Sequence, residues 1–321
     1  MDLFDPCWQR IARADDHRRR LSEVWNTYID SHPYDFALDH EGGGVHILRV
    51  WENHPVPADF AVRLGEWLYN VRSCLDYIIW ATAAYVAGTT PPPDEAAMQY
   101  PIYETREGWE RNRYRLKHLA DHHRQMLWTM QPFNSDPDAN YLGALNSLAR
   151  IDRHRRLTNG TAYLASLEPV VQVPSGTSVT FQWGQRVLTG GRADVARLSV
   201  EPWGDDMQVA INPRVGIDPE VGEWARSPFW RRIRFSERLT MIQVFVAAEI
   251  AVYEYDCTGE TRKPEALTDS YKAECDGRER NGRPVVIDEP WEWGPPAQGL
   301  SSTEQRFQGH DFPRHGPGAA S

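Results

Sequence analysis

The stretch that sets the architecture is "LYNVRSCLDYIIW", residues 68–80, where apolar side chains recur at three- and four-residue spacing. This spacing predicts one long helix over about 60–87, which Gly88 ends. At 100° per residue, Arg72 and Asp76 fall at the edge of the apolar sector and are close enough to contact each other. Charged groups at the margin of a buried face need polar partners, so we expect another part of the chain to bond to Arg72 and Asp76.

A second helix is predicted over about 138–157, from "YLGALNSLARIDRHRRLT" at 141–158. Its apolar face consists of Leu142, Leu145, Leu148 and Ala149. Asp152 falls at the centre of that face, Arg155 and Arg156 lie to either side of it, and His154 points elsewhere. A carboxylate at the centre of a packing face must be paired, neutralised or near water.

We therefore expect the two helices to pack together and their charges to pair. Arg72 is a natural partner for Asp152, because a guanidinium can meet a carboxylate through two parallel hydrogen bonds. Asp76 would then meet Arg155. Such a cluster is either a functional site or an ion-pair network that only fixes the helix register, and the sequence leaves both open.

The rest of the chain predicts an α+β fold. The expected core is a helical bundle with an N-terminal β-hairpin, and a small antiparallel sheet is inserted before the last long helix. The expected elements are a helix over 5–30, a hairpin around the glycines of "EGGG", one or two helices over 106–130, strands over 161–212 and a helix over 228–256. We predict a single domain over 1–257 and a flexible, disordered C-terminal tail over 258–321, where Pro and Gly are frequent.

Charge and cysteine usage narrow the function classes. With 35 basic and 45 acidic residues the net charge is −10, which disfavours indiscriminate nucleic-acid binding but allows a local basic patch. Four widely spaced cysteines without a C-x-x-C pair indicate reduced thiols in a cytoplasmic protein. The N-terminus lacks the apolar region of a signal peptide, and no apolar run approaches the length of a membrane span, so we expect no membrane partner.

Four short motifs carry a resemblance. "NVRSCLDYIIW", "QYPI", "MQPFN" and "LNSLARIDRHRRL" occur in this order, and the chain resembles a widespread uncharacterised family of bacteria and phages over roughly residues 5–250. The usual family pattern is Asn-Leu-Arg-Ser-Ala-Leu-Asp-His, then Phe-Pro-Ile, Gln-Pro-Tyr and Ile-Asp-Lys-His-Arg. The resemblance implies no particular chemistry.

The Arg-x4-His element of that family also resembles the helical HEPN superfamily, which includes many metal-independent RNases. The resemblance implies that Arg72 would steady a phosphate, but Tyr77 stands where the catalytic histidine is expected, and a tyrosine is a poor general base at neutral pH. Catalysis is then either absent or served by His154, across a possible homodimer interface. The candidate catalytic residues are Arg72 and His154, and the candidate binding residues are Asn70, Asp76, Tyr77, Asp152, Arg155 and Arg156.

Other patterns are weaker. His118 and His122 are four residues apart on a predicted helix, but no third ligand set follows them and the Glu of H-E-x-x-H is missing, so we expect neither a metal site nor a cofactor. "RNRYRLKHLADHHR", residues 111–124, mixes basic and aromatic residues. It predicts either a charged exposed helix face or a patch for RNA or a phosphate-bearing ligand.

Three functions remain open. The first is an HEPN-like, RNA-associated protein, in phage defence, that binds RNA and does not cleave it. The others are a catalytically inert scaffold and a module that binds a small molecule or phosphate; whether the protein is an enzyme stays uncertain. A wide groove lined by arginines and aromatic residues would favour RNA binding. A closed and fully paired cluster would favour the scaffold. A pocket that opens onto the cluster would favour a small ligand.

Overall fold

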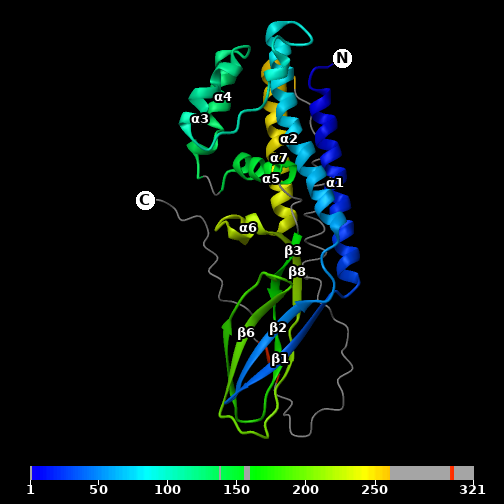
Figure 1. Cartoon of the computed structure of the whole chain (residues 1–321), viewed down its shortest axis with the longest axis vertical. Helices are drawn as coiled ribbons and strands as arrows, with labels where there is room; N and C mark the ends of the chain where they lie inside the picture. Colours follow the sequence, from blue (N-terminus) through cyan, green and yellow to red (C-terminus); the bar gives the residue numbers. More distant parts are fainter. Residues whose placement is uncertain (1, 137–138, 155–159, 261–303, 307–321) are drawn as a thin grey trace. The chain divides into compact units, whose positions relative to one another are not determined.

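The computed structural model describes residues 2–136, 139–154, 160–260 and 304–306 (Figure 1). These residues belong to two compact units, which are treated separately below. The helical unit draws on residues 1–31, 56–160 and 220–280, and the β unit on 32–55, 161–219 and 281–321. Both units contain segments far apart in the sequence, so each is assembled by tertiary contacts.

Three long helices form the centre of the helical unit. They are α1 (Asp5–Asp30), α2 (Ala58–Ala87) and α7 (Phe235–Thr258), and a shorter helix, α5 (Tyr141–His154), packs on α2 and α7. Figure 1 shows α2 and α7 running side by side next to α1. Gly88 and Gly259 end α2 and α7 with φ angles of +64° and +73°, a backbone conformation that glycine adopts without steric cost.

The apolar stripes predicted from the sequence form the core of this unit. From α2 the fully buried side chains include Leu64, Trp67, Leu68, Val71, Leu75 and Ile78; α5 contributes Leu145 and Leu148, and α7 contributes Ile242, Val246 and Ile250. These residues recur at three- and four-residue steps, so each helix turns one continuous face toward its neighbours. The packing of the two motif-bearing helices, α2 and α5, is therefore confirmed.

Short elements connect the long helices and form a side arm. The segment after α2 contains η1 (Glu95–Ala97), α3 (Arg106–Asn112), η2 (Arg113–Leu116), α4 (Asp121–Thr129) and η3 (Pro132–Asn134). Before α7 lie α6 (Gly222–Arg226) and η4 (Trp230–Arg232). We call residues 104–130 the α3–α4 arm, and Figure 1 shows its two helices beside the bundle.

The β unit is built around a four-stranded antiparallel sheet of order β1-β2-β6-β5. Its strands are β1 (Tyr34–Gly42), β2 (Val45–Glu52), β5 (Ser178–Trp183) and β6 (Arg192–Glu201). Two small sheets complete it: β3 (Gly160–Leu167) with β8 (Val215–Val221), and β4 (Val170–Gln172) between β7 (Ala210–Asn212) and β9 (Glu304–Arg306). Gly43 and Gly44, with φ angles of +57° and +77°, make the β1–β2 turn, so the "EGGG" run is a hairpin turn and not a phosphate loop.

The α+β architecture expected from the sequence is confirmed: the described residues form seven α-helices, an N-terminal hairpin and small antiparallel sheets before α7. The sequence did not predict that the N-terminal hairpin and the strands after residue 177 share one sheet, through the β2–β6 pairing. The predicted disordered tail lies almost wholly outside the described residues. Among the residues described, no helix is both long and apolar enough to cross a membrane.

One buried ion pair links the end of β8, just before α6, to α7. The guanidinium of Arg238 donates to both carboxylate oxygens of Glu220, at 2.8 Å for Nη2 to Oε2, and both side chains are 1% exposed. Arg238 also donates to the carbonyl of Ile233 at 2.8 Å and lies 5.5 Å from the ring centre of Trp224. A pair this deep is stable only while both charges are present.

Replacing Glu220 with Gln should therefore destabilise the protein by about 3–5 kcal/mol, because the charge of Arg238 is left buried without its counter-ion. Urea unfolding followed by circular dichroism measures the change. Glu223→Gln, one turn away on α6, is the matched control and should cost less than about 1 kcal/mol. Equal losses in the two variants would contradict the pairing.

Candidate functional site

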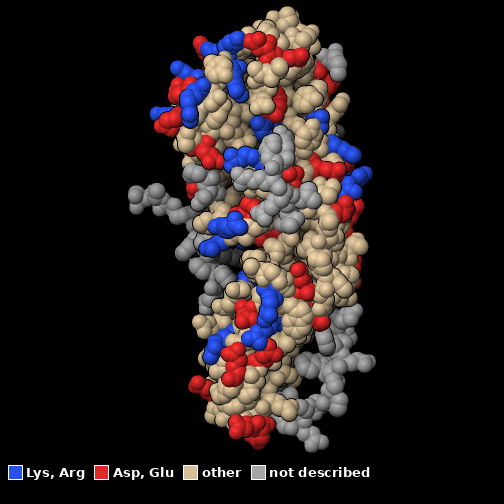
Figure 2. All heavy atoms as spheres, viewed as in Figure 1, with Lys and Arg blue, Asp and Glu red and all other residues tan. Residues whose placement is uncertain are grey.

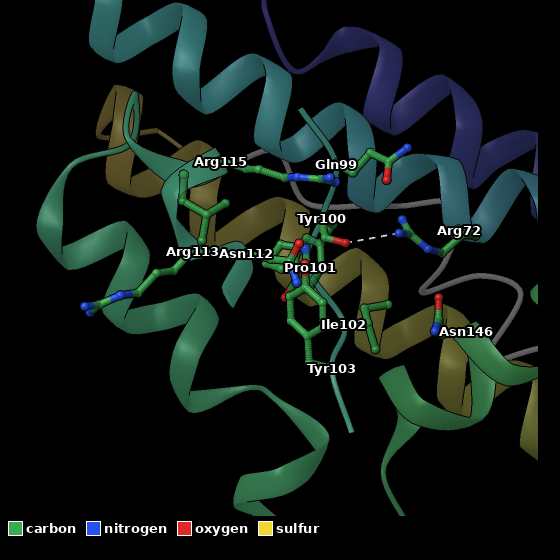
Figure 3. Close-up of a pocket in the computed structure, with 11 residues that line it drawn as sticks. Arg72, Gln99, Tyr100, Pro101, Ile102, Tyr103, Asn112, Arg113, Arg115 and Asn146 are labelled. Carbon is green, nitrogen blue, oxygen red and sulfur yellow. Dashed lines mark hydrogen bonds between the residues drawn. The ribbon is translucent and has the colours of Figure 1, made fainter. Parts of the chain in front are cut away.

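Arg72 and Asp76 hold the backbone of an extended segment that crosses α2. Arg72 Nη1 donates to Asp76 Oδ1 at 2.5 Å, and Arg72 Nη2 donates to the carbonyl oxygen of Tyr100 at 3.0 Å. The same Asp76 oxygen accepts from the backbone N–H of Tyr100 at 2.9 Å. The two charges thus bind both polar groups of one buried residue, and the segment 99–103 becomes a strap fixed to α2 (Figure 3).

Gln131 holds the strap from its other side. Its Nε2 donates to the carbonyls of Pro101 and Leu127, both at 2.9 Å, and its Oε1 accepts from the backbone N–H of Tyr103 at 2.9 Å. Gln131 is fully buried. A buried backbone group without a partner costs about 1–3 kcal/mol, so a single amide that answers three such groups fixes the strap to the end of α4.

The side chain of Tyr100 connects the strap to the bundle core. Its hydroxyl donates to Glu249 Oε2 of α7 at 2.7 Å, and both residues are buried. Burial raises the pKa of Glu249, although the hydrogen bond from Tyr100 opposes this effect. Burial and the neighbouring Glu249 also raise the pKa of Tyr100 well above its usual value, so the hydroxyl stays protonated and acts as the donor.

Arg72 of α2 is not paired with Asp152 of α5 as the sequence suggested, and the predicted contact of Asp76 with Arg155 lies outside the described residues. Arg72 bonds to Asp76 and Tyr100, whereas Asp152 lies against Gly65, two turns earlier on α2 and about 10 Å along its axis. A Cβ atom on Gly65 would stand 2.6 Å from Asp152 Oδ2, so any larger residue at this position would have to displace the Asp152 carboxylate. The expected Arg72–Asp152 pairing is therefore wrong, because the strap takes the donors of Arg72.

The other candidate residues of α2 face α1. Arg10 Nη1 donates to Asn70 Oδ1 at 3.3 Å, and the guanidinium lies 5.5 Å from the ring centres of both Tyr69 and Tyr77. Asn70 and Tyr77 thus both contact Arg10, through a hydrogen bond and a cation–π contact respectively, apart from the strap bonds of Arg72 and Asp76. The side chains of His154, Arg155 and Arg156 lie outside the described residues, so their predicted roles stay predictions.

A small polar pocket of about 170 Å³ opens beside the strap. Arg72 lines it from α2, Asn146 from α5, and Asn112, Arg113 and Arg115 from the arm. In Figure 3, Arg72 and Arg115 extend toward the strap from opposite sides, whereas Arg113 extends away from it. The pocket is lined by cations and amides and by no carboxylate, which suits an anion.

A wider groove of about 740 Å³ adjoins the pocket on the α3–α4 arm, and Arg113 lines both. Aromatic and basic side chains alternate along it: the full lining is Trp109, Glu110, Arg113, Tyr114, Lys117, Asp121, Arg124, Gln125 and Trp128. Tyr114 is 64% exposed and presents its ring to solvent. The mixed basic and aromatic pattern of 111–124 therefore forms a surface groove rather than a uniformly charged helix face.

Most cations of the groove have acidic neighbours. Arg113 lies 3.0 Å from Glu110, Arg124 pairs with Asp121, and Lys117 lies 2.6 Å from Asp94. Lys117 and His118 together hold the pKa of Asp94 at about 2. Figure 2 shows blue and red atoms side by side over this part of the surface. Exposed pairs of this kind are worth about 0–1 kcal/mol each and give way readily to a phosphate.

The histidine pair considered from the sequence does not converge on one point. His118 Nε2 lies 2.9 Å from Asp94, while His122 Nε2 lies 2.7 Å from Asp256 of α7. His123 Nε2 also lies 2.7 Å from Asp256. The i, i+4 spacing failed as a signal because His118 lies before α4 begins at Asp121.

Sequence reasoning missed Tyr100 of the strap and two side chains that bond to the strap, Gln131 and Glu249. The first two carried a signal, because they stand in the quoted "QYPI" and "MQPFN" motifs. Glu249 carried only a weak one, as a carboxylate between the apolar residues of the last helix.

Replacing Gln131 with Ala should cost about 2–4 kcal/mol, because at least two buried backbone groups of the strap lose their partner. Gln125→Ala, an exposed position on α4 shortly before Gln131, is the control and should change stability by less than about 0.5 kcal/mol. Chemical denaturation of both variants beside wild type measures the difference. A Gln131→Ala variant as stable as Gln125→Ala would show that the strap does not depend on this amide.

Glu249 predicts a pH dependence with a definite sign. Its pKa is raised in the folded protein, so its contribution to stability is present below the ordinary value of 4.5 and is lost as pH rises through the folded pKa. Glu249→Gln keeps an acceptor for Tyr100 and removes the ionisation. The Tm of the variant relative to wild type should therefore rise as pH increases from about 4 to 8. A difference that is constant over this range would contradict the shift.

Comparison of the chain with family models, with curated proteins and with solved structures finds no match in any of the three. The resemblance of the four motifs to a bacterial and phage family therefore stays a prediction, and the function has to be argued from the geometry above.

Proposed function

We propose that this protein binds single-stranded RNA along the groove of the α3–α4 arm and does not cleave it. The observation that carries the proposal is that the exposed ring of Tyr114 and the ring of Trp128 lie among basic side chains along one open groove, which the buried Trp109 also lines. Bases stack on aromatic rings while cations follow the phosphates, and this combination binds single strands with little sequence preference.

Local charge supports the proposal. Residues 106–129 contain six Arg or Lys and three Asp or Glu, a balance of 6 − 3 = +3 within a chain of net charge −10. A basic segment on an acidic protein concentrates attraction for phosphate at one place and disfavours binding elsewhere. The polar pocket beside the strap continues the groove, and Arg115 at its rim has no carboxylate partner among the described residues.

The position of Arg72 argues against RNA cleavage. Its guanidinium is 12% exposed and donates to Asp76 and to the strap, so little of it is left for a phosphate in the manner of an HEPN nuclease. Tyr77, at the position of the family histidine, lies against Arg10 instead. The motif residues thus fix the position of the arm, and the groove on the arm binds the ligand.

The scaffold alternative is favoured by one specific observation: the strap is a closed and mutually satisfied network. If the groove served only a protein partner, the same network would still fix the arm. A measurement of RNA binding distinguishes the RNA-binding function from the scaffold function. A scaffold would not need the exposed ring of Tyr114 or cations whose contacts weaken with salt.

Fluorescence anisotropy of a short labelled single-stranded RNA, in EDTA, provides the test. Tyr114→Ala should weaken binding on the order of 10-fold, as expected for the loss of one stacked base. Arg113→Ala should weaken binding and reduce the slope of log K against log salt by about 0.7 per lost phosphate contact. Tyr85→Ala and Arg19→Ala, exposed residues of the same types on α2 and α1, are the matched controls.

Two outcomes would overturn the proposal. Absence of RNA binding at low salt, or equal binding by Tyr114→Ala and Tyr85→Ala, would remove the groove as an RNA site and leave the scaffold. Metal-independent cleavage that is lost in both Arg72→Ala and His154→Ala would show an HEPN-like nuclease instead.

A further inference from the structure

Helices α4 and α7 meet at two histidines and one carboxylate. His122 Nε2 and His123 Nε2 each lie 2.7 Å from Oδ2 of Asp256, and the three potential ligand atoms lie within 4.8 Å of one another. The two imidazole rings are 4.0 Å apart between centroids. This cluster plays no part in the strap or in the RNA groove.

His123 is the unusual member of the cluster. Its side chain is 2% exposed, yet neither ring nitrogen has a hydrogen-bond partner: Nε2 is close to Asp256 but outside hydrogen-bond geometry. The ring stacks on Tyr253, 5.8 Å away between centroids at 24°, which fixes its direction. A buried polar group that is left unsatisfied costs free energy, and so it points to a missing partner.

We propose that His122, His123 and Asp256 bind a divalent first-row transition metal ion of the Zn²⁺ class. Two imidazole nitrogens and one carboxylate oxygen are a donor set that Zn²⁺ takes in proteins, with the fourth position left to water. Metal–ligand bonds of about 2.0–2.2 Å need ligand atoms roughly 3–3.5 Å apart, which small side-chain rotations provide. His122 is 59% exposed, so the open position faces solvent.

A hydrogen-bonded cluster satisfies this arrangement less well than a metal ion. Asp256 Oδ2 accepts a hydrogen bond from His122, whereas Nε2 of His123 lies 2.7 Å from the same oxygen but outside hydrogen-bond geometry.

A bound ion would join the α3–α4 arm to the long helix α7. The strap fixes the arm at the end of α4, through Gln131, and the ion would fix it at the start, through His122 and His123. The ion would then act on the arm as a structural link whose loss loosens α4.

The test uses the full chain with any affinity tag removed and with metal stripped by chelation. Isothermal titration with Zn²⁺, and the absorption spectrum with Co²⁺, report binding directly. We expect one equivalent bound in the micromolar range or tighter, and an affinity at least about 10-fold lower in His122→Ala and Asp256→Asn. His118→Ala, a histidine paired with Asp94 outside the cluster, should bind as wild type does.

Thermal unfolding provides a second readout. Saturating Zn²⁺ should raise the Tm of wild type and of His118→Ala, because the ion binds the folded state, but not that of His122→Ala. The exposure of His122 makes a folding defect in that variant easy to exclude from the Tm without metal. Absence of binding at micromolar Zn²⁺, or equal binding by wild type, His122→Ala and Asp256→Asn, would overturn the proposal.

Discussion

The bond between α2 and the backbone of Tyr100 is the constraint on which the helical unit depends. A chain that leaves a long helix at Gly88 and returns across it as an extended segment exposes N–H and C=O groups to an apolar surface. Asp76 and Arg72 satisfy both groups of Tyr100, and Gln131 satisfies the groups of the next residues. Without these side chains the strap would bury unpaired peptide groups, at a cost of about 1–3 kcal/mol for each.

This constraint explains why charges interrupt the apolar face of α2. An apolar residue at position 76 would pack well against a second helix, but it could not accept the N–H of Tyr100. The charge of Asp76 is in turn balanced by Arg72, one turn away, so a single ion pair bonds to both the N–H and the C=O of Tyr100. The motif residues therefore act on the position of the arm, whose surface carries the groove proposed above to bind RNA.

Placement of the arm also gives the two proposed sites their physical relation. The groove lies on α3, η2 and α4, elements too short to be stable as isolated helices in water. Their arrangement depends on the strap and on the contact of α4 with α7, where His122 and His123 meet Asp256. A protein that binds RNA on short elements needs such anchors, because ordering the arm on binding would otherwise reduce the affinity.

The sequence by itself determined the class of fold and its main elements. The three- and four-residue spacing in 60–87, 138–157 and 228–256, and the "EGGG" turn, depend on local periodicity and on glycine, so they can be recognised without tertiary information. It also determined that Arg72 and Asp76 are neighbours, because i, i+4 geometry is a property of the helix alone.

Only the tertiary structure decided what these charges contact. The sequence suggested Asp152, because a helical wheel shows which face a residue occupies but not its height along the neighbouring helix. The height is set by Gly65, where the absent Cβ lets Asp152 approach α2 two turns before Arg72. Likewise, Tyr100, Gln131 and Glu249 are separated by 31 and 118 residues along the chain, and His123 from Asp256 by 133. Contacts between residues so far apart in the sequence depend on how whole helices pack, and a local sequence pattern cannot predict them.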